Sequence, residues 1–162
     1  MVDWRVEKRN ADETLQRAKD IEFVGAYPEA VQNAIVSGEL YLKSMLRKKG
    51  IFIEQGNPND KTHDMNRLWT KVRANCGLSP TTIAALDNVF IHRGTGKGTL
   101  QYIDRTVPST SQSIPSHADC ADLPTTRYST DDATPEDYFD SAYALEKISL
   151  AETVKRELNP YL

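Results

Sequence analysis

The chain has 162 residues, a size typical of a single domain that buries its own core. Its net charge of −3 argues against a globally basic nucleic-acid binder, and two cysteines, Cys76 and Cys120, are too few for a disulfide framework. The charged N-terminus has no secretory signal and no apolar run is long enough to span a membrane, so we expect a cytoplasmic protein without membrane association. Histidine and cysteine spacing provides no second ligand pair for zinc, so we expect no metal and no cofactor.

The first predicted helix covers residues 11–24, where apolar side chains alternate with charges. Its apolar positions are Leu15, Ala18, Ile21, Phe23 and Val24. A short break then precedes Pro28, which suits a first helical turn because its missing N–H would have no intrahelical partner there. Two antiparallel helices and one longer helix kinked at Pro28 both fit this pattern.

Residues 28–49 form the clearest amphipathic helix of the chain, with apolar residues at steps of three and four. Gly50 suits the end of this helix. Gly38 lies in its interior, where glycine costs about 1 kcal/mol relative to alanine. We therefore expect a close helix–helix approach there, with the last helix docking on the small face at Ala34 and Gly38.

Two shorter helices are predicted next. The third begins near Asp60 or Thr62 and runs to about Asn75, with an apolar stripe at Met65, Leu68, Trp69 and Val72. Gly77 ends it. Ser79 and Pro80 are a suitable N-cap and first residue for the fourth helix, which runs to about His92. Its expected buried residues are Ile83, Leu86, Val89 and Phe90.

Residues 94–133 are rich in Gly, Pro, Ser and Thr, and a loop of this length is unusual in a compact domain. It is a functional lid, an insertion or a partly disordered segment. The sequence GTGKGT at 94–99 lacks the spacing of a phosphate-binding loop, so a flexible connector is favoured.

The last helix is predicted from Thr134 as N-cap, with Pro135 as its first residue, to about residue 158. Its expected apolar face is Tyr138, Ala142, Leu145, Ile148, Ala151 (or Leu150), Val154 and Leu158. The predicted fold class is therefore all-α, an up-and-down bundle of four or five helices with a long irregular insertion before the last helix. We expect one domain over 1–162 that contains the insertion at 94–133.

Charge is unevenly distributed along the sequence. Residues 43–73 hold eight Lys and Arg against three acidic residues, a net charge of +5, whereas residues 118–157 hold four against ten, a net charge of −6. The basic segment could meet phosphates or an acidic partner. The favoured interpretation is two solvated helix faces that attract each other across the bundle or between protomers, because charged faces are the rule on soluble helices.

The order of these motifs resembles the HEPN family of small helical bundles. His63, Asp64, Met65 and Leu68 are similar to the family's His-Asp start of a helix, and LDNVFIHR at 86–93 is similar to a later helix. Arg127-Tyr128-Ser129 is similar to an Arg-Tyr-Pro signature that precedes the final helix. The resemblance covers residues 11–93 and 127–158.

The resemblance implies two functional themes. Some members are metal-independent ribonucleases of toxin or defence systems, with an Arg and a His separated by four to six residues and two protomers forming one cleft. Others bind nucleotides or RNA, or pair with small nucleotidyltransferases. In this chain Asp87 stands at the Arg position before His92, with Asn88 after it. A carboxylate there would repel the phosphorane that an Arg would stabilise.

The sequence therefore favours a non-catalytic module that is homodimeric or paired with a nucleotidyltransferase and binds RNA or a nucleotide, in a toxin–antitoxin or defence context. One alternative is a ribonuclease with a degenerate site at His92 and Asn88. Another is a helical scaffold that uses its insertion for protein interaction.

Phosphate or nucleotide binding is the role that we assign to Arg93, Arg127, Tyr128 and His63. His63, Arg127 and Tyr128, and also the candidate catalytic residue His92, have alternative, purely structural interpretations. His92 could interact with the C-terminal dipole of the fourth helix, and His63 could satisfy first-turn amides. Arg127 and Tyr128 could stack on a base, clamp a phosphate, or fix the entry to the last helix.

Overall fold

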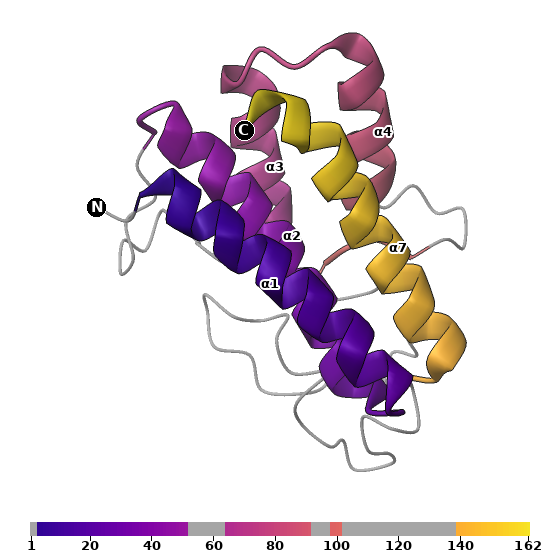
Figure 1. Ribbon diagram of the computed structural model, residues 1–162. Coiled ribbons are helices and arrows are strands. Elements are labelled where there is room, and N and C mark those ends of the chain that lie inside the picture. Colours follow the sequence, from indigo (N-terminus) through magenta and orange to yellow (C-terminus); the bar gives the residue numbers. More distant parts are fainter. Residues whose placement is uncertain (1–2, 52–63, 92–97, 102–138) are drawn as a thin grey trace.

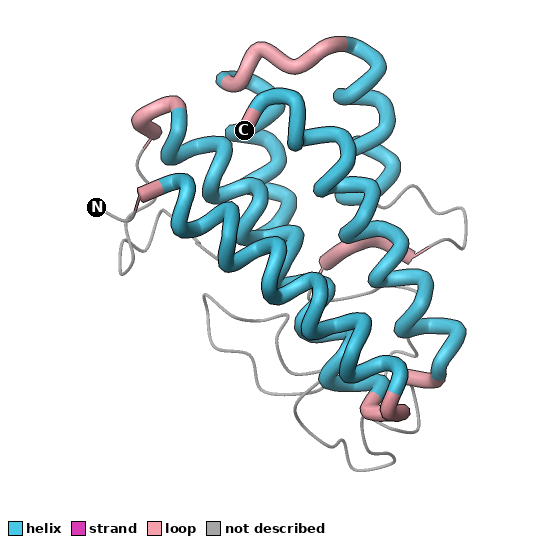
Figure 2. The backbone as a smooth tube through the Cα atoms, viewed as in Figure 1, coloured by secondary structure: helices cyan, strands magenta, loops and turns pink. Residues whose placement is uncertain are grey.

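The computed structural model describes residues 3–51, 64–91, 98–101 and 139–162. Within these residues the secondary structure is entirely helical, which confirms the predicted all-α bundle (Figures 1 and 2). The elements are α1 (Trp4–Phe23), α2 (Tyr27–Lys48), α3 (Met65–Asn75), α4 (Pro80–Phe90) and α7 (Ser141–Leu158), followed by the 3-10 helix η2 (Asn159–Tyr161).

The first two helices form an antiparallel pair rather than one kinked helix (Figure 1). Helix α1 begins at Trp4, seven residues before the predicted start, because the side chain of Asp3 accepts a hydrogen bond from the backbone N–H of Arg5. The apolar positions predicted at its C-terminal end were wrong: Phe23 is 89% exposed and Val24 is 76% exposed.

The predicted ends of α2, α3 and α4 agree closely with the structure. Gly50 follows α2 with a φ of 71°, and Gly77 follows α3 with a φ of 63°, a region that glycine enters without steric cost. Ser79 caps α4 as expected, accepting from the N–H of Thr82. Helix α3 begins later than predicted, at Met65, because the side chain of Asp64 accepts from the N–H of Arg67 and caps it.

The last helix differs more from its prediction. Phe139 and Asp140 are not helical, and the Asp140 side chain caps α7 by accepting from the N–H of Tyr143. The predicted N-cap at Thr134 was therefore wrong for this helix. The predicted buried face was also wrong at its N-terminal end, since Ala142 is exposed and Leu145 is 51% exposed. The buried residues of α7 are Ala144, Lys147, Ile148, Ala151, Val154 and Leu158.

One short segment between α4 and α7 enters the core. Leu100 is fully buried, and its backbone N–H donates to the carbonyl of Val89 at 2.8 Å. Leu100 and Met65 are the side chains nearest to Gly38, and Leu100 leaves no room for a Cβ there. The last helix does pack on α2, as expected. The expectation was wrong at Gly38, because the side chains closest to that position come from Leu100 and Met65.

Candidate functional site

Helix α4 carries the two residues of the ribonuclease-like pattern that the structure describes, Asp87 and Asn88. They are adjacent in sequence and have opposite environments. Asp87 is only 8% exposed, whereas Asn88 is exposed on the outer side of the helix. A helix turns about 100° per residue, so neighbours along it can face the core and the solvent.

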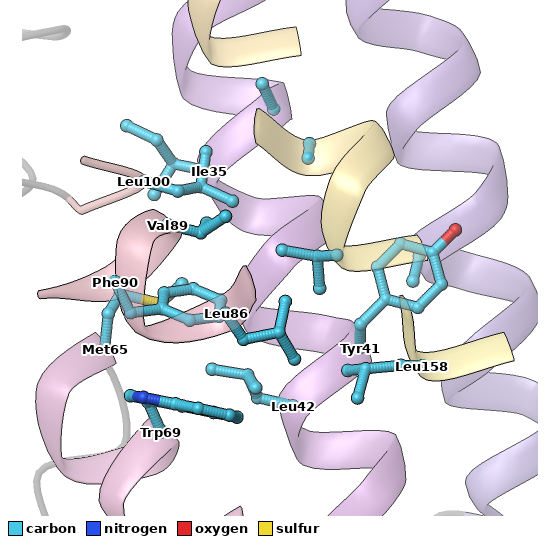
Figure 3. Packing of buried hydrophobic residues seen from close by; sticks show 14 of the residues in the cluster. Ile35, Tyr41, Leu42, Met65, Trp69, Leu86, Val89, Phe90, Leu100 and Leu158 are labelled. Carbon is cyan, nitrogen blue, oxygen red and sulfur yellow. The ribbon is translucent and has the colours of Figure 1, made fainter. Parts of the chain in front are cut away.

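Two side chains of α3 hold the Asp87 carboxylate. The indole N–H of Trp69 donates to its Oδ1 at 2.8 Å, and the Nε of Arg73 forms an ion pair with the same oxygen at 3.3 Å. Trp69 is buried and stacks on Phe90 with the ring centres 5.7 Å apart (Figure 3). Asp87 thus joins α3 to α4 as a hydrogen-bond acceptor, a role that keeps a buried polar group satisfied.

Two of the remaining predicted site residues follow the C-terminal end of α4 in the sequence. The N–H of Ile91 closes the helix by donating to the carbonyl of Asp87 at 2.9 Å. His92 and Arg93 follow Ile91 in the chain, and both lie outside the described residues. His63, Arg127 and Tyr128 also lie outside them, so their predicted roles stay predictions. Of the six predicted site residues, the structure therefore places Asn88.

The burial of one lysine, Lys147, was not predicted from the sequence. Lys147 is fully buried in α7, where its Nζ donates to the carbonyl of Thr99 at 2.7 Å and lies 4.8 Å from the ring centre of Tyr143. It therefore helps to fix the segment at 98–101 against α7. The available signal was its position one residue before Ile148, on the face that also carries Ala144, Ala151 and Val154.

The interface between α1 and α2 contains a second set of titratable groups. Glu7 forms an ion pair with Arg47, and Glu39 with Lys43, all from helices that pack closely. Burial raises the pKa of the Glu7 carboxyl, and the charge of Arg47 opposes this. The Glu7–Arg47 pair joins α1 to α2, whereas Glu39 and Lys43 pair within α2. The four side chains therefore neutralise one another pairwise beside the interface.

Asp12 and Tyr41 form another contact across the same interface, through a hydrogen bond from the Tyr41 hydroxyl. Burial acts to raise the pKa of Asp12, but hydrogen bonds from Tyr41 and Lys8 and the charge of Lys155 outweigh it and lower the pKa. Burial and the hydrogen bond to Asp12 together raise the pKa of Tyr41 well above its ordinary value. Tyr41 therefore stays a neutral hydrogen-bond donor.

An open groove of about 370 Å³ runs between α1 and α7. It is lined by Lys19, Glu22, Leu145, Ile148, Ser149 and Glu152. An ion pair between Lys19 and Glu152 crosses it, and the Glu22 carboxylate accepts a hydrogen bond from the Ser141 hydroxyl. Within the described parts of the chain, no three His, Cys, Asp or Glu side chains gather as metal ligands would. None of the helices described there is long and apolar enough to cross a membrane.

These observations define an all-helical bundle with a structural carboxylate at the position where a ribonuclease of the expected type would place arginine. The family model for the HEPN domain matches residues 4–158. The chain therefore belongs to the HEPN family. No curated protein and no solved structure matches it.

Proposed function

We propose that this chain is a non-catalytic HEPN module that binds RNA or a nucleotide, or pairs with a nucleotidyltransferase, in a toxin–antitoxin or defence setting. It acts in this proposal as a homodimer or within such a pair. Residues 1–162 form one domain with residues 94–133 as its insertion, a proposal supported by the burial of Leu100 and Phe139 in the same core.

The environment of Asp87 is the observation that carries the non-catalytic assignment. Its charge is opposite to that of the arginine in the ribonuclease pattern, and Trp69 and Arg73 hold its carboxylate in the bundle. A carboxylate held in this way offers no positive charge to a phosphorane, so transition-state stabilisation of the usual kind is lost at this position.

Asn88 supports the binding role. It is exposed beside the end of α4, and an amide side chain offers both hydrogen-bond donors and an acceptor. His92, Arg93, Arg127, Tyr128 and His63 are proposed to complete the phosphate- or nucleotide-binding surface. Asn88 is thus the described residue from which mutagenesis of that surface can begin.

RNA cleavage tests the proposal against its main alternative, a ribonuclease with a degenerate site at His92 and Asn88. The purified protein is incubated with a labelled structured RNA in the presence of EDTA, beside His92→Ala and Asn88→Ala. We expect no cleavage by any of the three proteins. Cleavage by the wild type that both substitutions abolish would establish the ribonuclease alternative instead.

Binding and pairing are tested separately from cleavage. Light scattering is expected to report a defined dimer, and titration with RNA or a nucleotide is expected to show binding that Asn88→Ala weakens several-fold. Thr81→Ala provides a matched control, because Thr81 is exposed near the start of the same helix. A monomer that binds neither RNA nor nucleotides and captures no nucleotidyltransferase would contradict the proposal.

A further inference from the structure

Positive charge gathers at the end of the bundle where α1 begins and α2 ends (Figure 1). Residues 3–9 and 47–51 contain six Lys and Arg and two acidic residues, a net charge of +4. The whole chain has a net charge of −3. The net charge of this end is therefore positive, although that of the whole chain is negative. A local positive potential attracts anions.

Among the residues that the structure describes, these six cations have few acidic partners. Arg47 is paired with the buried Glu7, and Lys8 with Asp12 at 3.0 Å. The other four, which are all exposed, are Arg5, Arg9, Lys48 and Lys49. Among the described residues, the ion pair found for this group is Arg5 with Asp3 at 3.8 Å, with both side chains more than half exposed. Such a pair contributes little and is easily exchanged for another anion.

Trp4 organises two of the four cations. The guanidinium carbon of Arg5 lies 4.6 Å from the centre of the Trp4 ring, and the Nζ of Lys48 lies 4.7 Å from it. The two charged groups are therefore at most about 9 Å apart, the sum of these distances. The ring thus fixes the positions of two cations from different helices. Such an arrangement favours a ligand that carries more than one negative charge.

Backbone contacts fix this arrangement to the rest of the bundle. The carbonyl of Trp4 accepts from the Ser44 hydroxyl at 2.8 Å, and the Nζ of Lys48 donates to the carbonyl of Tyr161 at 2.8 Å. The start of α1, the end of α2 and η2 are thereby tied together. Arg5 and Lys48 consequently lose less freedom when a ligand binds than two unrestrained surface side chains would.

We propose that this basic end surface, formed by Trp4, Arg5, Arg9, Lys48 and Lys49, binds the sugar–phosphate backbone of single-stranded nucleic acid. Several cations spread over two helices match a polymer with a phosphate at every unit, and the Trp4 ring holds two of these cations in place for it. This surface is separate from the one proposed around Asn88, which lies about two helical turns along α4 from Ser79, the residue that contacts Tyr161 beside Lys48. The inference goes beyond the function proposed above by adding a second nucleic-acid surface.

The test uses fluorescence anisotropy with a labelled oligo(dT) of about 15 nucleotides, measured between about 50 and 200 mM salt. DNA lacks the 2′-hydroxyl that a metal-independent ribonuclease uses as nucleophile, so the readout is independent of whether the chain cleaves RNA. We expect the wild type to bind. A plot of the logarithm of the association constant against the logarithm of the salt concentration should have a slope of about −3, because each of the four cations contributes about −0.7 on single strands.

Charge reversal assigns that binding to the surface. Lys48→Glu with Lys49→Glu is expected to weaken it about tenfold or more and to reduce the slope by about 1.4. Arg17→Glu with Arg67→Glu makes the same change in net charge at two exposed residues elsewhere and is expected to change the affinity by less than about threefold. Arg9→Glu is a second variant of this surface, and it leaves the contacts of Lys48 with Trp4 and Tyr161 intact. It should also weaken the binding of oligo(dT).

Three outcomes would overturn the proposal. The first is no binding of oligo(dT) at low salt by the folded wild type. The second is equal weakening by the Lys48/Lys49 and Arg17/Arg67 double variants, which would assign the binding to overall charge alone. The third is tighter binding of polyglutamate than of oligo(dT) at equal charge, which would make an acidic protein segment the partner.

Discussion

The pair α1–α2 and the pair α3–α4 are joined in different ways. The first two helices have 20 and 22 residues and meet through buried polar contacts, such as Ser37 with the carbonyl of Ala11 and Glu7 with Arg47. The other two have 11 residues each and meet through the rings of Trp69 and Phe90 and through Asp87. The long helices α1 and α2 contact each other along many residues, whereas the short helices α3 and α4 are joined by a few side chains.

This contrast bears on function. In α1–α2 the buried charges of Glu7 and Arg47 neutralise each other, and the cations left for a ligand lie at the exposed end of the pair. In α3–α4 a single carboxylate occupies the position that would define a catalytic site in a ribonuclease of the expected type. The same chemical group that removes positive charge from that position also attaches α4 to α3.

The largest expected effect concerns the buried ion pair of α1–α2. Arg47→Met leaves the Glu7 carboxylate buried without its partner, so we expect a loss of about 3 kcal/mol in the free energy of unfolding at pH 7. Replacing both residues, as Glu7→Leu with Arg47→Met, removes the unpaired charge and is expected to restore most of that loss. Urea unfolding measures both. A double variant as unstable as Arg47→Met would show that shape, not charge, joins these helices.

The same carboxyl predicts a pH dependence. The pKa of Glu7 is raised in the folded protein, so the folded state binds its proton more tightly than the unfolded state does. Its contribution to stability is therefore present below its ordinary value of 4.5 and is lost as the pH rises through the raised value. In Arg47→Met the loss between low pH and pH 7 should be larger than in the wild type. Unfolding curves across this range would contradict the account if the two proteins lose stability equally.

A smaller effect is expected at the contact between Gly38 and Leu100. Gly38→Val places a branched side chain against Leu100, so we expect a loss of about 1–3 kcal/mol from overpacking. In a Leu100→Ala background the same substitution should cost less, because the space is then free. Ala84→Val, at an exposed position of α4, is the control for the helix propensity of valine. Additive losses in the double variant would show that residues 98–101 do not pack on α2 as described.

The smallest expected effect is at Asp12. Its pKa is lowered in the folded state, so its contribution to stability is present above its ordinary value of 3.8 and is lost as the pH falls through the lowered value. Asp12→Asn is expected to cost about 1 kcal/mol or less at pH 7, because the side chain is partly exposed, and less still at pH 3. Asp20→Asn, on an exposed position of α1, should be close to neutral at both pH values. A cost for Asp12→Asn that does not shrink with falling pH would refute this assignment.

The sequence predicts the middle of the fold well, because apolar spacing and capping residues agree there. Ser79 and Pro80 begin α4 as expected, and Met65, Leu68, Trp69 and Val72 are all buried. The predictions fail at helix ends. Phe23, Val24 and Leu145 are apolar and largely exposed, since apolar character does not require burial and much of any protein surface is apolar.

The site was less predictable than the fold. The sequence identified Asp87 as a departure from the ribonuclease pattern but gave no sign of its contacts with Trp69 and Arg73, which depend on how α3 crosses α4. The docking of Leu100 on Gly38 was missed because residues 98–101 carry too few apolar side chains to show a period. His92, Arg93, Arg127, Tyr128 and His63 lie outside the described residues, so their roles rest on the resemblance and on the experiments above.

The most direct test of the central claim compares Asp87→Arg with Asn88→Arg by equilibrium urea unfolding. If Asp87 is a structural acceptor, arginine there faces the indole N–H of Trp69 and the guanidinium of Arg73, and we expect a loss of about 3 kcal/mol or more. Arginine at the exposed, adjacent position 88 should change stability by no more than about 0.5 kcal/mol. An Asp87→Arg protein that is as stable as Asn88→Arg, and that gains metal-independent cleavage of RNA, would contradict the account.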